Sequence, residues 1–267
     1  MKNILNKIYI HPFFLLVLLL FILMGRFKFI VYFMLLIAVH ELGHILISLL
    51  FKWKIHKIII LPFGALTKYD ETINKPLKEE FLVSISGVLF QLIFYNLITN
   101  FIDYEYFNLI NNFIIIFNLL PIYPLDGSKI ISVLFNKITS FKNSILLEVI
   151  ISYMCIIFLS LFLFNINKIL FLVLVFLFVE VNKYYKNKDL MFNKFLLERY
   201  LKSFKFKKEK IIININQMKK DYRHIFYINK KYMTENSFLG KIFDISNNLW
   251  YYFKRVGPHS TTTQRRF

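Results

Sequence analysis

Three polar residues interrupt the apolar stretch FMLLIAVHELGHILISLLF, residues 33–51, and their types and spacing indicate metal chemistry. His40 and His44 are four residues apart, so in a helix both imidazoles emerge from one face, one turn apart. Two imidazoles at this spacing can hold one zinc ion. Glu41 follows the first histidine and is placed to act as a general base on water and later as a proton donor. Ionisable side chains at bilayer depth cost about 3 kcal/mol each on insertion scales, so we expect these residues to be functional.

A catalytic zinc site needs a third protein ligand, and three acidic residues near bilayer depth are candidates. Asp126 lies in FNLLPIYPLDGSK, where Pro121 and Pro124 each remove a backbone N–H and end the preceding helix. Irregular backbone at membrane depth is tolerated where it is buried in protein or lines a wet cavity. Glu148 and Glu180 lack such a context and are expected to be helix-end charges near the membrane interface. Asp126 is therefore the predicted third ligand.

Six apolar segments place these residues in a membrane protein. The 267 residues are 57% hydrophobic with a mean hydropathy of +0.53, well above a soluble domain. Most of the segments approach the roughly 20 residues that a helical span needs. They cover residues 9–25, 29–51, 81–102, 107–122, 144–164 and 166–182. The sequence thus predicts an α-helical polytopic membrane protein of about six transmembrane helices. The first segment is expected to be a retained span, because no small-residue cleavage site follows it.

The distribution of basic residues predicts the orientation. Of the 34 Lys and Arg residues, 31 lie in the first eight residues, in segments 52–80 and 126–143, and from residue 183 onward. These regions share one side if both termini are cytoplasmic, as the positive-inside rule favours. The net charge of +18 therefore reflects the membrane topology, with a basic cytoplasmic face near anionic lipid. Nucleic acid is not an expected partner. The single cysteine, Cys155, excludes an intrachain disulfide and a cysteine zinc cluster.

The segment KIHKIIILPFGALTKYD, residues 54–70, predicts a membrane-associated β-rich loop on the cytoplasmic side. Two interpretations stay open. The segment is either a strand that dips into the membrane and offers an edge to an extended substrate, or a surface loop with an apolar anchor. His56 within it is expected to be a surface histidine rather than a metal ligand.

The combination of HELGH on the second span with NLLPIYPLDG later resembles the site-2 proteases, zinc metalloproteases that cut substrates within the membrane. LPFG at 61–64, KPLKEEF at 75–81 and FLLERY at 195–200 resemble the branch of the sporulation stage IV protein FB type. The resemblance covers roughly residues 1–200, with the motifs in the same order. One departure is Val88 after Gly87, where the family usually has a Gly-Pro pair.

The resemblance implies roles for individual residues. His40, His44 and Asp126 would bind one Zn²⁺ per chain, and Glu41 would be the catalytic acid and base. A group comprising Asn118, Pro121 and Pro124 would hold the substrate near the metal. The amide of Asn118 can hydrogen-bond an extended substrate backbone or the developing oxyanion, and an interhelical hydrogen bond is its alternative role.

The chain divides into three predicted regions. Residues 1–188 form the six-span metalloprotease domain. Residues 189–256 form a small cytoplasmic α/β unit that resembles a shortened CBS domain, with strands near 211–215 and 225–228. His224 stands apart from other ligand-like residues there, so this unit is expected to position or regulate the substrate without doing chemistry. Residues 257–267 are expected to be a disordered tail.

The predicted function is intramembrane zinc-dependent hydrolysis of a peptide bond in or near a membrane-associated segment. By resemblance, the substrate is the precursor of a sporulation sigma factor of the pro-sigma-K type. Two inhibitory membrane proteins are the implied partners, and the mother-cell membrane around the forespore is the implied location. A site-2 protease acting on another membrane-bound regulator and an inactive membrane scaffold are the alternatives. A scaffold is expected to lose Glu41 or a ligand, and a transporter is expected to distribute polar residues through several spans.

Overall fold

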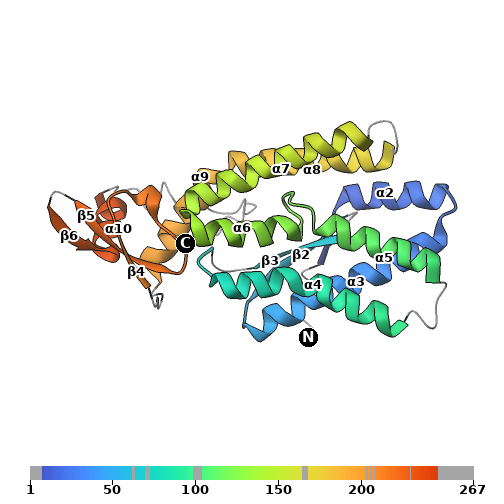
Figure 1. The fold of residues 1–267 in the computed structure, drawn as a ribbon, viewed down its shortest axis with the longest axis horizontal. Helices are drawn as coiled ribbons and strands as arrows, with labels where there is room; N and C mark the ends of the chain where they lie inside the picture. Colours follow the sequence, from blue (N-terminus) through green and yellow to red (C-terminus); the bar gives the residue numbers. More distant parts are fainter. Residues whose placement is uncertain are drawn as a thin grey trace, which may run out of the picture.

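The computed structural model describes residues 8–61, 64–69, 73–98, 104–163, 168–202, 204, 206, 208–228 and 230–245. It is mostly helical, with two three-stranded sheets. Figure 1 shows a body of long helices lying side by side, with the C-terminal strands gathered at one end. The predicted disordered tail, residues 257–267, lies outside the described residues.

Six apolar helices overlap the six predicted segments. They are α2 (Pro12–Leu23), α3 (Phe27–Leu50), α4 (Leu77–Ile98), α5 (Tyr104–Asn118), α7 (Phe141–Leu163) and α8 (Lys168–Lys186). In the part of the chain that the structure describes, α3, α4 and α7 are long and apolar enough to cross a membrane. These three helices agree with the predicted membrane protein, and the count of six spans stays a prediction.

Helix α6 (Asp126–Ile138) differs from the prediction, which placed residues 126–143 in a connection between spans. The helix has 13 residues, too few to span a bilayer and too few to stand out as an apolar segment. It packs between α4 and α7, as Figure 1 shows. Its first residue is Asp126, so the helix fixes where this carboxylate enters the helical body.

The β-rich segment forms a hairpin in the first sheet. Strand β2 (Ile55–Leu61) pairs antiparallel with β3 (Gly64–Tyr69), and β1 (Ile8–Ile10) pairs parallel with β2. The order is β1-β2-β3, so β1 covers one edge of the hairpin and β3 forms the other edge of the described sheet. Figure 1 shows β2 and β3 within the helical body, close to α6. The strands are as the sequence predicted, but the pairing with β1 was not anticipated.

The C-terminal unit, defined here as residues 188–245, comprises one long helix and a small sheet layered with a helix. Its elements are α9 (Lys188–Leu201), β4 (Lys208–Ile212), the short 3-10 helix η1 (Ile215–Gln217), β5 (Tyr222–Ile228), β6 (Lys231–Thr234) and α10 (Glu235–Ile245). Strand β4 is parallel to β5, and β5 is antiparallel to β6. One hydrophobic core runs from Leu177 of α8 through Phe195 of α9 to Phe226 and Leu239. The C-terminal unit is therefore packed onto the helical body.

Arg199 joins the C-terminal unit to the segment before α4. Its guanidinium is buried and donates to Asn74 Oδ1 at 2.8 Å, to the carbonyls of Lys219 and Tyr222 at 2.8 and 2.6 Å, and to Glu235 Oε1 at 3.1 Å. A planar guanidinium with five donors can hold four partners in this way. Arg199 belongs to the FLLERY motif, and this role was not predicted from the sequence.

The isolation predicted for His224 is wrong. The side chain is fully buried, and its Nδ1 lies 3.2 Å from Glu235 Oε2 while its Nε2 accepts the Lys219 N–H at 3.0 Å. Burial lowers the pKa of His224 below its ordinary value, so the ring is neutral in the fold. Burial alone would raise the pKa of Glu235, but the hydrogen bond from His224 and the charge of Arg199 hold that pKa below its usual range. His224 is thus a structural partner of Glu235.

Candidate active site

Helix α3 presents His40 and His44 on one face, buried from solvent. Their Nε2 atoms are 3.1 Å apart, and the rings meet edge to face at 74° with centroids 4.9 Å apart. This is the arrangement that i,i+4 spacing predicts. Glu41 is also buried and lines the cavity described below.

Asp126 meets both histidines although it lies more than eighty residues later in the chain. Its Oδ2 is 3.0 Å from His40 Nε2 and 2.8 Å from His44 Nε2. Among the described residues, these three side chains form a group of ligand atoms close enough to share one metal ion. Ligand atoms in a tetrahedral zinc site are about 3.3 Å apart, since each lies about 2.0–2.1 Å from the metal.

Hydrogen bonds at Nδ1 orient the two imidazoles. His40 Nδ1 faces Gln91 Oε1 at 3.0 Å, and His44 Nδ1 faces the carbonyl of Val83 at 2.6 Å. A carbonyl oxygen only accepts, so each ring donates from Nδ1 and turns Nε2 toward Asp126 Oδ2. In the neutral form of both rings, two imidazole lone pairs and a carboxylate oxygen converge at about 3 Å. Such a nitrogen, nitrogen and oxygen set fits a divalent cation such as zinc.

Two glycines allow this close assembly. A Cβ on Gly87 would lie 2.6 Å from His40 Nε2 and 2.7 Å from His44 Cε1, so α4 can pass behind the imidazoles because this position has no side chain. A Cβ on Gly127 would run into the carbonyls of Leu119 and Leu120. Gly127 therefore lets the start of α6, with Asp126, pack against the segment that follows α5. Val88, the departure from the Gly-Pro pair, lies within the uninterrupted helix α4.

The residues predicted to hold the substrate make hydrogen bonds to other parts of the protein or shape the segment before Asp126. Asn118 is buried, and its Nδ2 donates at 3.0 Å to the carbonyl of Ile114 in its own helix. The carbonyl of Pro121 accepts from Ser152 Oγ at 3.4 Å, and the Tyr123–Pro124 peptide is cis. Within the described chain, the lining of the cavity includes Tyr123 and lacks Asn118 and both prolines. The hydrogen bond of Asn118 found in the described residues lies within α5 and differs from the interhelical bond of its alternative role.

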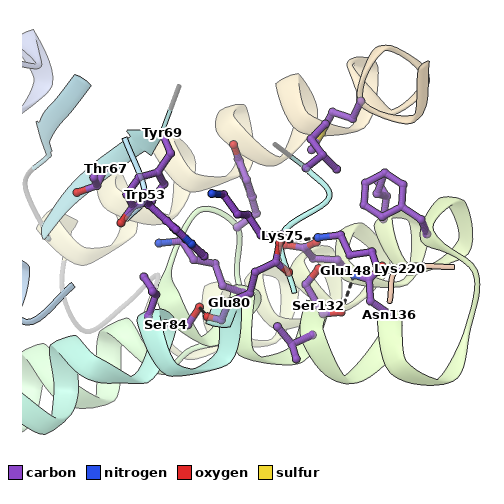
Figure 2. Close-up of a pocket in the computed structure, with 18 of the residues that line it drawn as sticks. Trp53, Thr67, Tyr69, Lys75, Glu80, Ser84, Ser132, Asn136, Glu148 and Lys220 are labelled. Atoms are coloured by element: carbon purple, nitrogen blue, oxygen red, sulfur yellow. Dashed lines mark hydrogen bonds and ion pairs between the residues drawn. The ribbon is translucent and has the colours of Figure 1, made fainter. Parts of the chain in front are cut away.

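A cavity of about 300 Å³ extends from the candidate metal site to the C-terminal unit. Glu41 and His44 line it together with polar residues of several further elements and segments. These include Thr67 and Tyr69 of β3, Glu80 and Ser84 of α4, Lys129, Ser132 and Asn136 of α6, Glu148 of α7, and Lys220. Figure 2 shows Thr67 and Tyr69 on one side of the pocket and Ser132, Asn136, Glu148 and Lys220 on the other. The cavity therefore joins the side chain of Glu41 to the C-terminal unit through Lys220.

Glu148 is not the helix-end charge that the sequence predicted, because it lies about two turns into α7. Its side chain is buried, lines the cavity and accepts a hydrogen bond from the Tyr184 hydroxyl at 2.9 Å. The sequence could not show this, because α7 is apolar around most of its circumference and gives no sign of which face points inward. Glu180 is paired with Lys183 at 2.6 Å and is partly exposed, in keeping with a charge near a helix end.

Three residues that sequence reasoning missed support the three candidate ligands or their loop. Gln91 contacts His40, as described above. Lys129 Nζ donates to Asp126 Oδ1 at 2.8 Å from the next turn of α6. Ser152 Oγ accepts from the Tyr123 N–H at 3.1 Å and so ties α7 to the segment before Asp126. Gln91 had one usable signal, since it is a polar residue inside an apolar span.

Comparison with known proteins identifies the family. Residues 28–106 match Peptidase family M50. The stage IV sporulation protein FB of Bacillus subtilis is 34% identical over 205 residues, which cover 73% of this chain and 71% of that protein. This chain belongs to Peptidase family M50, the site-2 protease family. A zinc metalloprotease of Methanocaldococcus jannaschii is 29% identical over 179 residues, covering 58% of this chain and 52% of that protein.

A solved structure of an M50 peptidase shares the fold. The site-2 protease from Methanocaldococcus jannaschii superimposes with a TM-score of 0.54 at 26% identity, over 66% of this chain and 89% of that one. The predicted family and enzyme class are confirmed: the chain is an intramembrane metalloprotease, and its relatives imply zinc as the metal.

Proposed function

We propose that His40, His44 and Asp126 hold one zinc ion and that Glu41 is the catalytic base and acid in peptide hydrolysis. The observation that carries this assignment is the convergence of three lone-pair donors 2.8–3.1 Å apart, with both histidine Nδ1 protons committed elsewhere. One cation placed among these side chains would take one ligand atom from each of them.

The chain's own residues would perform the proton transfers. A bound zinc ion polarises a carbonyl and makes water nucleophilic at neutral pH. Glu41 lines the cavity next to His44, so its carboxylate can take a proton from the attacking water and give it to the departing amine. Lys129 keeps one oxygen of Asp126 occupied and leaves the other directed at the histidines.

An extended substrate would lie along β3. This strand is an edge of its described sheet, and its Thr67 and Tyr69 line the cavity that contains Glu41. Pairing with β3 would expose substrate carbonyls that a helix shields, which favours the edge-strand interpretation over a surface loop. Asn118, Pro121 and Pro124 keep their proposed substrate-holding role. For Asn118 this requires its amide to leave the carbonyl of Ile114.

The proposed substrate is a membrane-associated precursor of a sporulation sigma factor. The support is the similarity to a protein named stage IV sporulation protein FB. Inhibitory membrane proteins and a location in the mother-cell membrane around the forespore belong to the same proposal. Another membrane-bound regulator is the alternative substrate.

The C-terminal unit is proposed to position or regulate the substrate, with the metalloprotease domain at 1–188 and the CBS-like region at 189–256. Its Lys220 lines the cavity and pairs with Glu80 of α4 at 2.6 Å. The carboxylate of Asp221 accepts the N–H of Leu77, the first residue of α4, at 3.3 Å. A substrate held by this unit would therefore reach the cavity from the docked end.

Both termini are proposed to be cytoplasmic, from the distribution of basic residues. Topology reporters fused at residues 104 and 190 should then report opposite sides of the membrane. Reporters that both indicate the cytoplasm would contradict the six-span arrangement.

The enzyme assignment is tested with Glu41→Gln, which keeps the shape of the side chain and removes the base. Co-expressed with a membrane-associated sigma precursor, the variant should lose cleavage by at least about 100-fold, the range of a general base. Purified in detergent, it should contain as much zinc as the wild type. His40→Ala is the matched control and should lose both zinc and cleavage. Wild-type cleavage by Glu41→Gln would support a scaffold or another catalytic residue.

A further inference from the structure

A buried chain of hydrogen bonds connects His40 to two further helices. Gln91 of α4 accepts from His40 Nδ1 at 3.0 Å through its Oε1. Its Nε2 donates to Asn111 of α5, at 3.0 Å to Oδ1 and at 3.3 Å to the backbone carbonyl. Gln91 is 0% exposed and Asn111 is 1% exposed. Helices α3, α4 and α5 therefore meet in one polar contact inside an apolar surrounding.

Asn111 determines which way the Gln91 amide points. The backbone carbonyl of Asn111 only accepts, so the NH₂ group of Gln91 must face it. The carbonyl of Gln91 is then directed at His40, which must donate from Nδ1. Reversing the amide would place donors against the His40 N–H and an acceptor against the Asn111 carbonyl, and a buried unmade hydrogen bond costs about 1–3 kcal/mol.

The other two candidate ligands are supported differently. His44 relies on the main-chain carbonyl of Val83, which a substitution does not remove. Asp126 relies on Lys129, whose side chain is 41% exposed and can exchange with water. Among these three contacts, Gln91 is the fully buried side chain, so water cannot easily replace its bond to His40.

Asn111 also belongs to the face of α5 that carries Asn118. The two residues are seven apart, close to two full turns, and Ile114 between them is buried on the same side. The contact with Gln91 therefore holds α5, whose end leads into the segment that delivers Asp126, in register with α3.

We propose that Gln91, oriented by Asn111, is a positioning residue that fixes the tautomer and ring orientation of His40 for metal binding. This inference rests on the proposed zinc site. Carbonyl or carboxylate partners of ligating histidines commonly contribute 10–100-fold to metal affinity, because they keep Nε2 deprotonated and the ring aimed at the metal.

The test compares Gln91→Leu, Gln91→Glu and Asn182→Leu in the full-length, detergent-purified protein. Leucine fills the site without accepting from His40, whereas glutamate restores an acceptor. Asn182→Leu is the matched control, because it removes an interhelical bond to the Tyr153 hydroxyl, 2.6 Å long, between α7 and α8. Zinc affinity is measured by chelator competition, and the absorption spectrum of the cobalt-loaded protein reports the ligand geometry.

Gln91→Leu should lower zinc affinity about 10–100-fold and change the cobalt spectrum. Gln91→Glu should retain more zinc affinity than Gln91→Leu, because its carboxylate still accepts from His40 Nδ1, although it also places an oxygen against the Asn111 carbonyl. Asn182→Leu should match the wild type even if it melts earlier. If Gln91→Leu does not fold, Gln91→Asn, whose carbonyl is about 1.5 Å too short, should show the weakened affinity instead.

Wild-type affinity in Gln91→Leu or Gln91→Asn would overturn the inference, and so would equal losses in Gln91→Glu and Gln91→Leu. The proposed zinc site fails separately, if the wild type binds no zinc or if His40→Ala retains it.

Discussion

Replacing Gly87 by alanine should remove zinc from an otherwise folded protein. Gly87 lies in α4, directly behind the two imidazoles of α3. Alanine stabilises a helix by about 1 kcal/mol relative to glycine, so the substitution should not unfold α4. The expected damage comes from the single added methyl group at the metal site.

The size of the displacement follows from the geometry. The new Cβ would lie 2.6 Å from His40 Nε2 and closer still to His44 Nε2, where ordinary contact begins at 3.4 Å. The imidazoles or α4 must therefore move by about 0.8 Å or more. Metal–ligand distances in zinc sites are held within about 0.2 Å, so the displacement exceeds the tolerance several-fold. We expect zinc affinity to fall by at least about tenfold, with cleavage lost in parallel.

The assay measures zinc content and chelator-competed affinity of the detergent-purified variant, with thermal unfolding to establish the fold. Gly43→Ala is the matched control, because its Cβ would meet the same helix, 2.6 Å from the Ser86 carbonyl and 2.9 Å from Phe90 Cβ, and no imidazole. It should lower the unfolding temperature and retain more zinc than Gly87→Ala. Full zinc affinity in Gly87→Ala would refute the packing argument. Equal zinc loss in both variants would show that separation of α3 from α4, and not contact with the imidazoles, causes the loss.

Two further predictions concern the C-terminal unit. Lys220→Met leaves the carboxylate of Glu80 without its 2.6 Å partner, so thermal unfolding should show a loss of about 1–3 kcal/mol, reduced by the partial exposure of Glu80, with zinc content unchanged. Loss of zinc in this variant would show that the unit supports the metal site directly. The pKa values of His224 and Glu235 both lie below their ordinary values, so at these two residues the unfolded chain binds more protons than the folded chain as pH falls. Their contribution to the free energy of unfolding should therefore decrease from about pH 7 to about pH 5.5. Over this range the unfolding temperature of His224→Asn should fall less, or rise more, than that of the wild type, and equal changes in the two proteins would contradict that sign.

The sequence by itself determined the parts of this protein that depend on short-range pattern. The spacing of His40 and His44 places two ligands on one helical face whatever surrounds them. Pro121 and Pro124 end an apolar helix just before Asp126. Irregular backbone near bilayer depth must be buried in protein or line a wet cavity, so the sequence selects this carboxylate as the third candidate ligand. Long apolar runs identify the helices that cross or enter the membrane, and three of them meet the length and composition of a span in the described chain.

The short helix α6 was missed for the same reason. Its 13 residues mix polar and apolar side chains and follow a proline-rich segment, so neither span length nor continuous hydrophobicity marks it. Tertiary packing against α4 and α7 stabilises it, which is how most short helices gain their stability.

Only the tertiary structure decided which polar side chains face one another. Helices α3, α4 and α7 are apolar around most of their circumference, because lipid requires it, so no amphipathic stripe tells which face turns inward. Gln91 meets His40 and Glu148 lines the cavity through contacts between helices far apart in the chain. His224 finds Glu235 across the small sheet, and Gly87 matters because two rings lie where its side chain would be. Each of these contacts depends on how helices and strands pack, because their side-chain atoms meet at about 3 Å. The spacing of residues along the chain does not specify that packing.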